Sequence, residues 1–275
     1  MGSLAAATGV VGAASALACG AACAAQCYAS SDAAIEAAIM ANIISVEPAA
    51  PPAGTSTSNQ HLVTIILLPG FTGSAEHLVP WFQRMSLFGV NLKSVRLVAT
   101  TPPERNITCY DGWRANAWFD YIDEQFDVED IIDVSQLAQS RRALTRIVDA
   151  EVVRLGGDAS KVLLLGFSQG GNVGYDLALS YPQQLGGFIA RRTSLREETA
   201  LGQHKALPIL HYHGEEDDGI GVSRGKHSVA RLQAAGYSKV ELHLEPGLNH
   251  TDFSDKEMKA YAAFLGAIYP HLLKA

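Results

Sequence analysis

The stretch Lys161-Val-Leu-Leu-Leu-Gly-Phe-Ser-Gln-Gly-Gly171 decides the fold of this chain. Its aliphatic residues 162–165 are typical of a buried strand, and residues 172–179 after it have the spacing of a helix. Between them lies a G-x-S-x-G pattern, in which a serine occupies a strained turn from strand to helix. Glycine at both ends of the pattern avoids collisions with neighbouring backbone. The pattern therefore predicts that Ser168 is presented at a strand end as a nucleophile.

The same pattern occurs a second time, at Gly221-Val-Ser-Arg-Gly225. It follows an acidic, glycine-rich loop, and no apolar strand leads into it, so we do not expect Ser223 on a comparable turn. The alternative for Ser168 is an ordinary glycine-rich connection with an incidental serine. The strand, turn and helix around Ser168 favour the catalytic interpretation.

Outward from this stretch, strand and helix patterns alternate. Residues 61–68 are a nearly unbroken aliphatic run that ends in Pro69-Gly70, as in strands buried on both faces. Residues 135–155 have helical spacing, and Ser254 with Glu257 forms a capping box before a final helix. Further strands are predicted at 95–98, 161–165, 185–189, 209–213 and 240–244. The alternation predicts an α/β fold with a mostly parallel central sheet, helices on both faces and ligands at the carboxyl ends of the strands.

The composition is that of a globular protein. Of 275 residues, 48% are hydrophobic and 18% charged, which excludes wholesale disorder and a coiled coil. The net charge of −7 argues against a nucleic-acid partner held by phosphate contacts. Cys109 is the only cysteine after position 27, so the main body has no internal pair to bridge. This predicts a reducing, cytoplasmic compartment.

The first 60 residues differ in composition from the rest. Residues 1–31 carry no charge and lack both the basic start of a signal peptide and the apolar density of a spanning helix. A short helix is predicted at 32–42, and the proline, serine and threonine of 45–60 indicate a linker. We therefore expect a disordered tail over 1–60 and a single folded domain over 61–275.

Three cysteines of the tail fall at helical spacing. Cys19, Cys23 and Cys27 would share one face of a helix, where acylation would attach the protein transiently to membranes. The alternative is an unstructured, alanine-rich extension with no such role. Composition favours the unstructured extension.

A nucleophilic serine needs a base and an acid that orients the base. The strand at 240–244 leads into Glu245-Pro-Gly-Leu-Asn-His250, which places His250 after a strand and before the final helix. The strand at 209–213 ends in an acidic cluster, in which we choose Asp217 over Asp218 and Glu216. Spacing alone leaves all three acids open, and a solvated turn without a role is the further alternative.

These residues resemble the acyl-protein thioesterase and carboxylesterase family of α/β-hydrolases over roughly 61–272. Besides the serine turn, the matching pieces are Ala117-Trp-Phe-Asp120, His213-Gly214 with Asp217 three residues beyond, and Gly247-Leu-Asn-His250. The resemblance implies an α/β-hydrolase fold with Ser168 as nucleophile, Asp217 as orienting acid and His250 as general base. It implies no metal and no organic cofactor.

Ester cleavage also needs donors for the developing oxyanion. One is the N–H of Gln169, directly after the nucleophile. By the resemblance, the other belongs to the loop Pro69-Gly70-Phe71, where Phe71 N–H matches the family position. Family members carry His in place of Pro69 and Gly-Asp in place of Thr72-Gly73, so the loop differs in detail.

The substrate is less clearly indicated. The stretch 190–198 is highly charged where the family presents apolar residues along an acyl channel, which argues against a lipid substrate. Trp118 and Phe119 are candidates to line an acyl pocket, although central aromatics are more often core.

We therefore expect a serine hydrolase that cleaves carboxylic ester or thioester bonds, in small-molecule esters or S-acylated proteins. Depalmitoylation and lysophospholipase activity fall within this expectation. One alternative is a carboxylesterase for short, polar esters, with Arg191 and Arg192 at the rim of its site. Another is a catalytically silent α/β-hydrolase that acts as a binding module.

Overall fold

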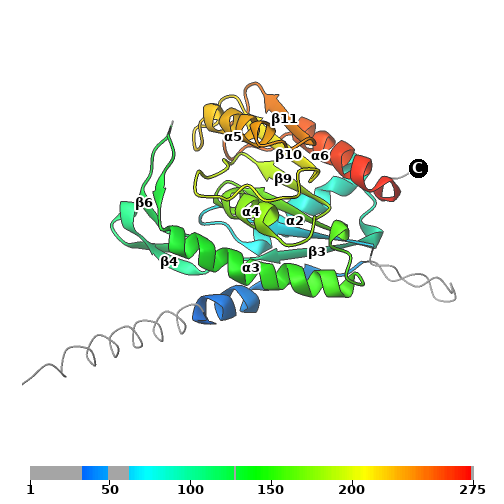
Figure 1. Ribbon diagram of the computed structural model, residues 1–275, viewed down its shortest axis with the longest axis horizontal. Coiled ribbons are helices and arrows are strands. Elements are labelled where there is room, and N and C mark those ends of the chain that lie inside the picture. The colour runs from blue at the N-terminus through cyan, green and yellow to red at the C-terminus, as the bar shows by residue number, and fades with distance from the viewer. Residues whose placement is uncertain (1–32, 49–61, 127, 274–275) are drawn as a thin grey trace, which may run out of the picture.

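A seven-stranded sheet forms the centre of the computed structural model, which describes residues 33–48, 62–126 and 128–273 (Figure 1). Its strand order is β1-β3-β2-β8-β9-β10-β11, and all neighbouring strands except β1 and β3 pair in parallel. The strands are β1 (Ile43–Val46), β2 (Val63–Leu68), β3 (Val95–Thr100), β8 (Val162–Phe167), β9 (Gly187–Arg191), β10 (Ile209–Gly214) and β11 (Val240–Glu245). The predicted mostly parallel sheet is confirmed.

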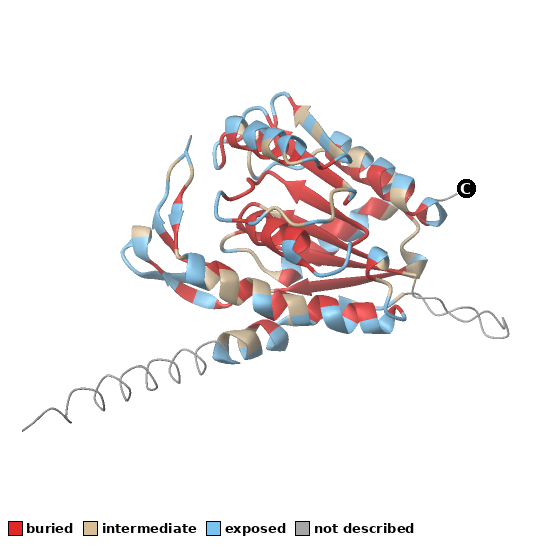
Figure 2. Ribbon diagram, in the orientation of Figure 1, coloured by how far each residue is buried: buried red, intermediate tan, exposed pale blue. Residues whose placement is uncertain are grey.

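Helices cover both faces of the sheet. The helices are α2 (Ala75–Gln83), α3 (Val134–Arg154), α4 (Gln169–Ser180), α5 (Val222–Ala234) and α6 (Asp255–Ile268). The apolar residues of α3, α4 and α5 form one core with one face, and those of α2 and α6 form a second core with the other. Figure 2 shows the buried sheet between helices whose outer sides are exposed. Alternate residues of each strand therefore face different cores.

Short 3₁₀ segments and two hairpins complete the described chain. The 3₁₀ segments are η1 (Arg84–Phe88), η2 (Leu92–Ser94), η3 (Thr108–Tyr110), η4 (Ala159–Lys161) and η5 (Pro270–Leu272). One hairpin pairs β4 (Glu104–Ile107) with β5 (Trp113–Asn116), and the other pairs β6 (Tyr121–Asp123) with β7 (Ile131–Ile132). Both hairpins project on the left of Figure 1. None of the described helices is long and apolar enough to cross a bilayer.

The folded domain begins earlier than the expected boundary at residue 61. A helix over 33–41 confirms the short helix predicted there, but it is followed by β1, which pairs with β3. Ile39 is fully buried, and its carbonyl oxygen accepts a 2.8 Å hydrogen bond from Thr100. Strand β1 was not predicted because it has only four residues, Ile-Ile-Ser-Val, just before the prolines that indicated a linker. The rest of the tail, including Cys19, Cys23 and Cys27, lies outside the described residues.

The start of α6 differs from a reciprocal capping box. Ser254 Oγ accepts the N–H groups of Lys256 and Glu257 at 3.1 and 3.4 Å, as predicted. The Glu257 carboxylate, however, points into the protein and is fully buried. It does not return to the backbone of Ser254, because two arginines and a tyrosine hydroxyl bind it instead.

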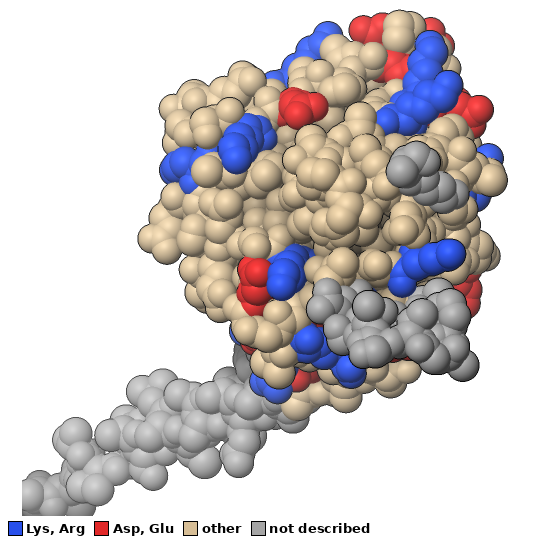
Figure 3. All heavy atoms as spheres, turned by 90° about the vertical axis from the view of Figure 1, so that its right-hand side faces the viewer, with Lys and Arg blue, Asp and Glu red and all other residues tan. Residues whose placement is uncertain are grey.

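The charged side chains on the face shown in Figure 3 are scattered. Lys and Arg lie among uncharged and acidic residues there and do not merge into one basic surface. A nucleic acid held by phosphate contacts would need such a surface.

Two histidines of β10 belong to a buried hydrogen-bond chain. The Tyr175 hydroxyl lies 2.8 Å from His211 Nδ1, and His211 Nε2 lies 3.1 Å from His213 Nδ1. His213 Nε2 lies 2.8 Å from the carbonyl oxygen of Ile220. Burial lowers the pKa of both imidazoles below 6.5, and the proximity of His213 adds to the effect on His211. Both rings are therefore neutral in the folded protein near pH 7.

We expect the free energy of unfolding to fall as the pH is lowered below about 6.5, because these imidazoles take up protons in the unfolded chain only. Each histidine contributes a slope approaching about 1.4 kcal/mol per pH unit between its lowered folded pKa and its unfolded pKa. His211→Gln should reduce the slope by up to one histidine's share, whereas His271→Gln, at an exposed position, should not. Urea unfolding from about pH 5 to 7.5 measures the slopes, and equal slopes in all three proteins would contradict this origin.

Candidate active site

Ser168 lies on a tight turn between β8 and α4, which we call the serine turn (166–170). Its backbone has φ 53° and ψ −124°, a strained conformation for a residue other than glycine. A Cβ atom on Gly166 would lie 2.4 Å from the carbonyl oxygen of Gly170, and one on Gly170 would lie 2.2 Å from that of Leu68. The predicted need for both glycines is confirmed. The Ser168 side chain is consequently held at the carboxyl end of β8.

The structure brings the three predicted catalytic residues together. Ser168 Oγ lies 3.0 Å from His250 Nε2. His250 Nδ1 lies 2.8 and 3.0 Å from the two carboxylate oxygens of Asp217. Asp217 is buried, whereas its neighbours Glu216 and Asp218 are exposed. The residues follow the carboxyl ends of β8, β10 and β11, so the geometry can pass a proton from a serine hydroxyl to an oriented imidazole.

Asp217 is held as an anion. Burial acts to raise the pKa of its carboxyl, but the hydrogen bond and charge of His250 and the N–H of Ile220 outweigh this, and the pKa lies below its usual value. One carboxylate oxygen accepts the N–H groups of Gly219 and Ile220 at 2.9 and 2.8 Å. These donors fix the carboxylate facing His250, as an orienting acid requires.

The expected oxyanion donors lie on either side of Ser168. Gln169 opens α4, and Phe71 belongs to the loop 69–73, which we call the donor loop. A Cβ atom on Gly70 would lie 3.1 Å from Ser168 Cβ, so the donor loop contacts the serine turn. Within the described residues, the N–H groups of Phe71 and Gln169 have no protein acceptor. Both are available to an anionic oxygen at Ser168.

Trp118 and Phe119 support the site and do not line a pocket. Both side chains are fully buried, so the expectation that they contact substrate is wrong. Trp118 Nε1 donates to the carbonyl oxygen of Pro69 at 2.8 Å, which ties down the donor loop. The Gln169 side-chain amide accepts from the N–H of Trp118 and donates to the carbonyl oxygen of Phe119, at 2.8 and 2.9 Å. The rings of Trp118 and Phe119 therefore belong to the hydrophobic core.

An apolar cavity of about 350 Å³ lies beside the serine turn. Its apolar lining includes Phe71, Leu78, Trp81, Phe167 and Phe253. The Phe167 ring lies 5.0 Å from the His250 ring. Sequence reasoning missed Leu78, Trp81 and Phe253 because α2 and the segment before α6 are distant from Ser168 in sequence.

A larger cavity of about 980 Å³ lies at the opposite ends of the strands, bordered by Lys161, Pro208 and Lys239.

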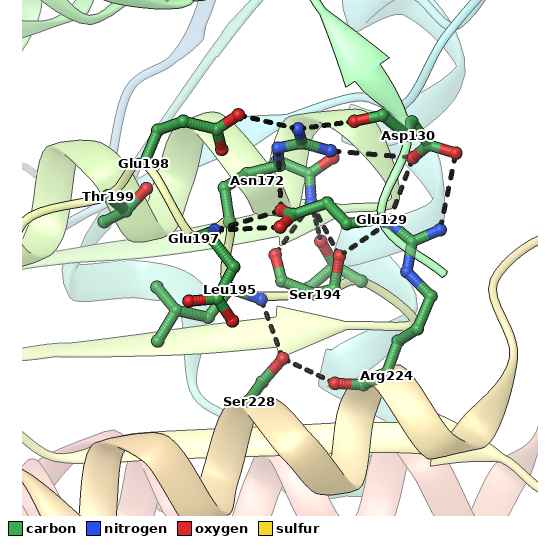
Figure 4. A network of polar contacts seen from close by, with 12 residues as sticks. Glu129, Asp130, Asn172, Ser194, Leu195, Glu197, Glu198, Thr199, Arg224 and Ser228 are labelled. Atoms are coloured by element: carbon green, nitrogen blue, oxygen red, sulfur yellow. Dashed lines mark hydrogen bonds and ion pairs between the residues drawn. The ribbon is translucent and has the colours of Figure 1, made fainter. Parts of the chain in front are cut away.

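The arginine side chains of the charged stretch 190–198 are directed inward, whereas Glu197 and Glu198 are exposed. Arg192 and Arg196 are fully or almost fully buried, which corrects the expectation of a charged channel and of Arg192 at a polar rim. Arg196 pairs with Glu129, Asp130 and Glu198. Arg224 pairs with Asp130 at 2.9 Å (Figure 4). Arg191 borders the cavity, but its guanidinium lies over the rings of Phe167 and Trp81 at 4.3 and 4.8 Å. The arginines of this stretch are therefore compatible with an apolar ligand in the cavity beside Ser168.

Comparisons with known proteins agree with this architecture. Acyl-protein thioesterase 1 of Gibberella zeae is 26% identical over 76% of this chain and 91% of its own length. A probable inactive carboxylesterase of Oryza sativa subsp. japonica is 27% identical over 62% of this chain and 69% of its own. The crystal structure of Arabidopsis thaliana SOBER1 superimposes with a TM-score of 0.67 and 25% identity, covering 75% of this chain and 98% of that one.

The family profile decides the relationship. The profile of the phospholipase/carboxylesterase family matches residues 52–269. The match covers the sheet from β2 to β11, the serine turn and the loop that carries His250. The predicted resemblance and the α/β-hydrolase fold are thereby confirmed, and the chain belongs to the phospholipase/carboxylesterase family of hydrolases.

Proposed function

We propose that this protein hydrolyses carboxylic ester or thioester bonds through an acyl-enzyme on Ser168. The observation that carries the proposal is the unbroken contact from Ser168 Oγ through His250 to Asp217, with distances of 3.0 and 2.8 Å. The apolar cavity beside Ser168 supports an apolar group in the substrate. The substrate is then a small-molecule ester or an S-acylated protein.

The reaction follows from the arrangement of the groups. His250 Nε2 takes the proton of Ser168 Oγ as the oxygen attacks the carbonyl carbon, and Asp217 keeps the other ring nitrogen protonated. The N–H groups of Phe71 and Gln169 stabilise the tetrahedral oxyanion, each by about 3 kcal/mol. The alcohol or thiol leaves with the proton from His250. His250 then deprotonates a water that attacks the acyl-enzyme, which releases the carboxylic acid and restores the serine.

A catalytically silent binding module is the rival function, because one relative is described as a probable inactive carboxylesterase. A module of this kind has no need for a serine in contact with an oriented imidazole. The retained contacts of Ser168, His250 and Asp217 therefore favour the enzyme.

A fluorophosphonate probe tests the proposed nucleophile, because it reacts with serines whose proton is removed by a base. We expect one adduct on the wild-type protein, mapped to the peptide that contains Ser168, and none on Ser168→Ala. Ser168→Ala should also lower kcat for p-nitrophenyl esters by at least about 1,000-fold. Intact-mass spectrometry and peptide mapping provide the readout.

Ser223→Ala is the matched control, because Ser223 occupies the other G-x-S-x-G pattern but is exposed on α5. It should label like the wild type. A wild-type protein without an adduct would favour the binding module, and an adduct that persists in Ser168→Ala would place the nucleophile elsewhere.

The cavity predicts a preference for apolar acyl groups. We expect kcat/KM to rise from p-nitrophenyl acetate to the octanoate, and Phe253→Ala to lower kcat/KM for the octanoate about tenfold through lost apolar contact. Phe253 is 64% exposed, so its removal should spare the fold. Leu87→Ala, which is 75% exposed and outside the cavity lining, is the control. A maximum at acetate, unchanged in Phe253→Ala, would instead favour a carboxylesterase for short, polar esters.

A further inference from the structure

We propose that Arg192 and Glu257 are positioning residues that hold the backbone of the His250 loop, and with it the imidazole, at the distance that Ser168 requires. The loop spans 246–254, between β11 and α6. Together with Arg191 they form a group that we call the arginine clamp. The proposal rests on the proposed function of Ser168 and His250. It identifies the residues that set the distance between these two side chains.

Arg192 binds the loop directly. Its Nη1 donates to the carbonyl oxygens of His250 and Asp252, both at 2.7 Å, and its Nη2 donates to a Glu257 carboxylate oxygen at 2.8 Å. The side chain is fully buried. A planar guanidinium presents its donors in a fixed fork, so three contacts define where the two carbonyls lie. One of these carbonyls belongs to the residue that carries the imidazole.

Glu257 anchors the other side of the clamp. One of its carboxylate oxygens accepts from Arg191 Nε at 2.8 Å and from the Tyr261 hydroxyl at 2.7 Å. Arg191 also donates to the carbonyl oxygen of Asp252, at 3.0 Å. Glu257 lies in the first turn of α6, where the helix dipole favours a negative charge. The position of the loop is therefore tied to the start of α6.

The same dipeptide also holds the nucleophile. The N–H of Ser168 donates to the carbonyl oxygen of Arg191 at 3.0 Å, and the N–H of Arg192 donates to that of Tyr212 at 2.8 Å. Arg192 has φ 43°, in the left-handed region, so the chain turns sharply just after β9. Residues 191 and 192 thus contact the backbone of Ser168 on one side and the backbone of His250 on the other.

The charge balance makes the clamp rigid. Two buried guanidinium groups share one carboxylate, so the remaining positive charge depends on the carbonyl oxygens of His250 and Asp252. If the loop moved away, Arg192 Nη1 would lose both acceptors in a site that water does not reach. Leaving a buried charge without its partners is strongly unfavourable. The loop is therefore held even when no substrate is bound.

The test compares Arg192→Met, Arg192→Lys and Glu257→Gln with Arg196→Lys as control. Arg196 is equally buried and donates to the carbonyl oxygen of Asp130 at 2.7 Å, but it does not contact the His250 loop. We expect Arg192→Met and Glu257→Gln to lower kcat for p-nitrophenyl butyrate about 10- to 100-fold, with KM changed by less than about twofold, because the base is displaced from Ser168. Arg192→Lys should retain more activity than Arg192→Met.

A proton NMR measurement tests the position of His250 independently of turnover. The proton between His250 Nδ1 and Asp217 should give a strongly deshielded proton resonance in the wild type, which His250→Gln removes. We expect Arg192→Met and Glu257→Gln to lose this resonance and Arg196→Lys to keep it. Thermal melts confirm that each variant is folded, and Arg192→Lys supplies a variant that keeps the buried charge if Arg192→Met does not fold.

Two outcomes would overturn the proposal: folded Arg192 and Glu257 variants with wild-type kcat and an intact resonance, or an equal loss in Arg196→Lys. If the wild type shows neither turnover nor fluorophosphonate labelling, the proposed function fails, and the resonance then decides on the clamp alone. Its selective loss in the clamp variants would support the clamp, and its retention would overturn it.

Discussion

The close approach of Gly170 to the carbonyl oxygens of Leu68 and Pro69 is the constraint on which the site depends. A Cβ atom on Gly170 would lie 2.2 and 2.3 Å from these two oxygens, so only glycine lets the serine turn meet the end of β2 at this distance. That contact places the donor loop beside Ser168. Trp118 then fixes both partners of this contact, because it donates hydrogen bonds to Pro69 in the donor loop and to the side chain of Gln169 in the serine turn.

Several charged residues are buried behind the site, although the cavity beside Ser168 is apolar. The arginines of 190–198 point inward and are compensated by carboxylates from the β6–β7 hairpin, the segment after β9 and α6. Pairs of this kind seldom add much stability over apolar packing, because removing the charges from water is costly. Their benefit is geometric: each guanidinium specifies the position of the carbonyl oxygens around it.

The sequence predicted the parts that follow local rules. Buried strands, the serine turn and the position of His250 after β11 follow from apolar runs and glycine placement. The choice of Asp217 over Asp218 needed the resemblance, because adjacent loop residues cannot be ordered by spacing alone. Strand β1, the cavity residue Trp81 and the buried role of Arg192 were not predicted, because each depends on a partner distant in sequence. Trp118 and Phe119 were predicted to line an acyl pocket, and their burial could not be read from residue type.

Strand β1 has a consequence for how the sheet ends. Its four residues run antiparallel to β3 and cover what would otherwise be the free edge of an entirely buried strand, Val95–Thr100. An uncovered edge of that kind exposes a row of unpaired amides and carbonyls, which is a template for pairing with another chain. Trimming the protein back to the start of β2 would create such an edge, so we regard residues 43–46 as a protection of the folded domain against self-association.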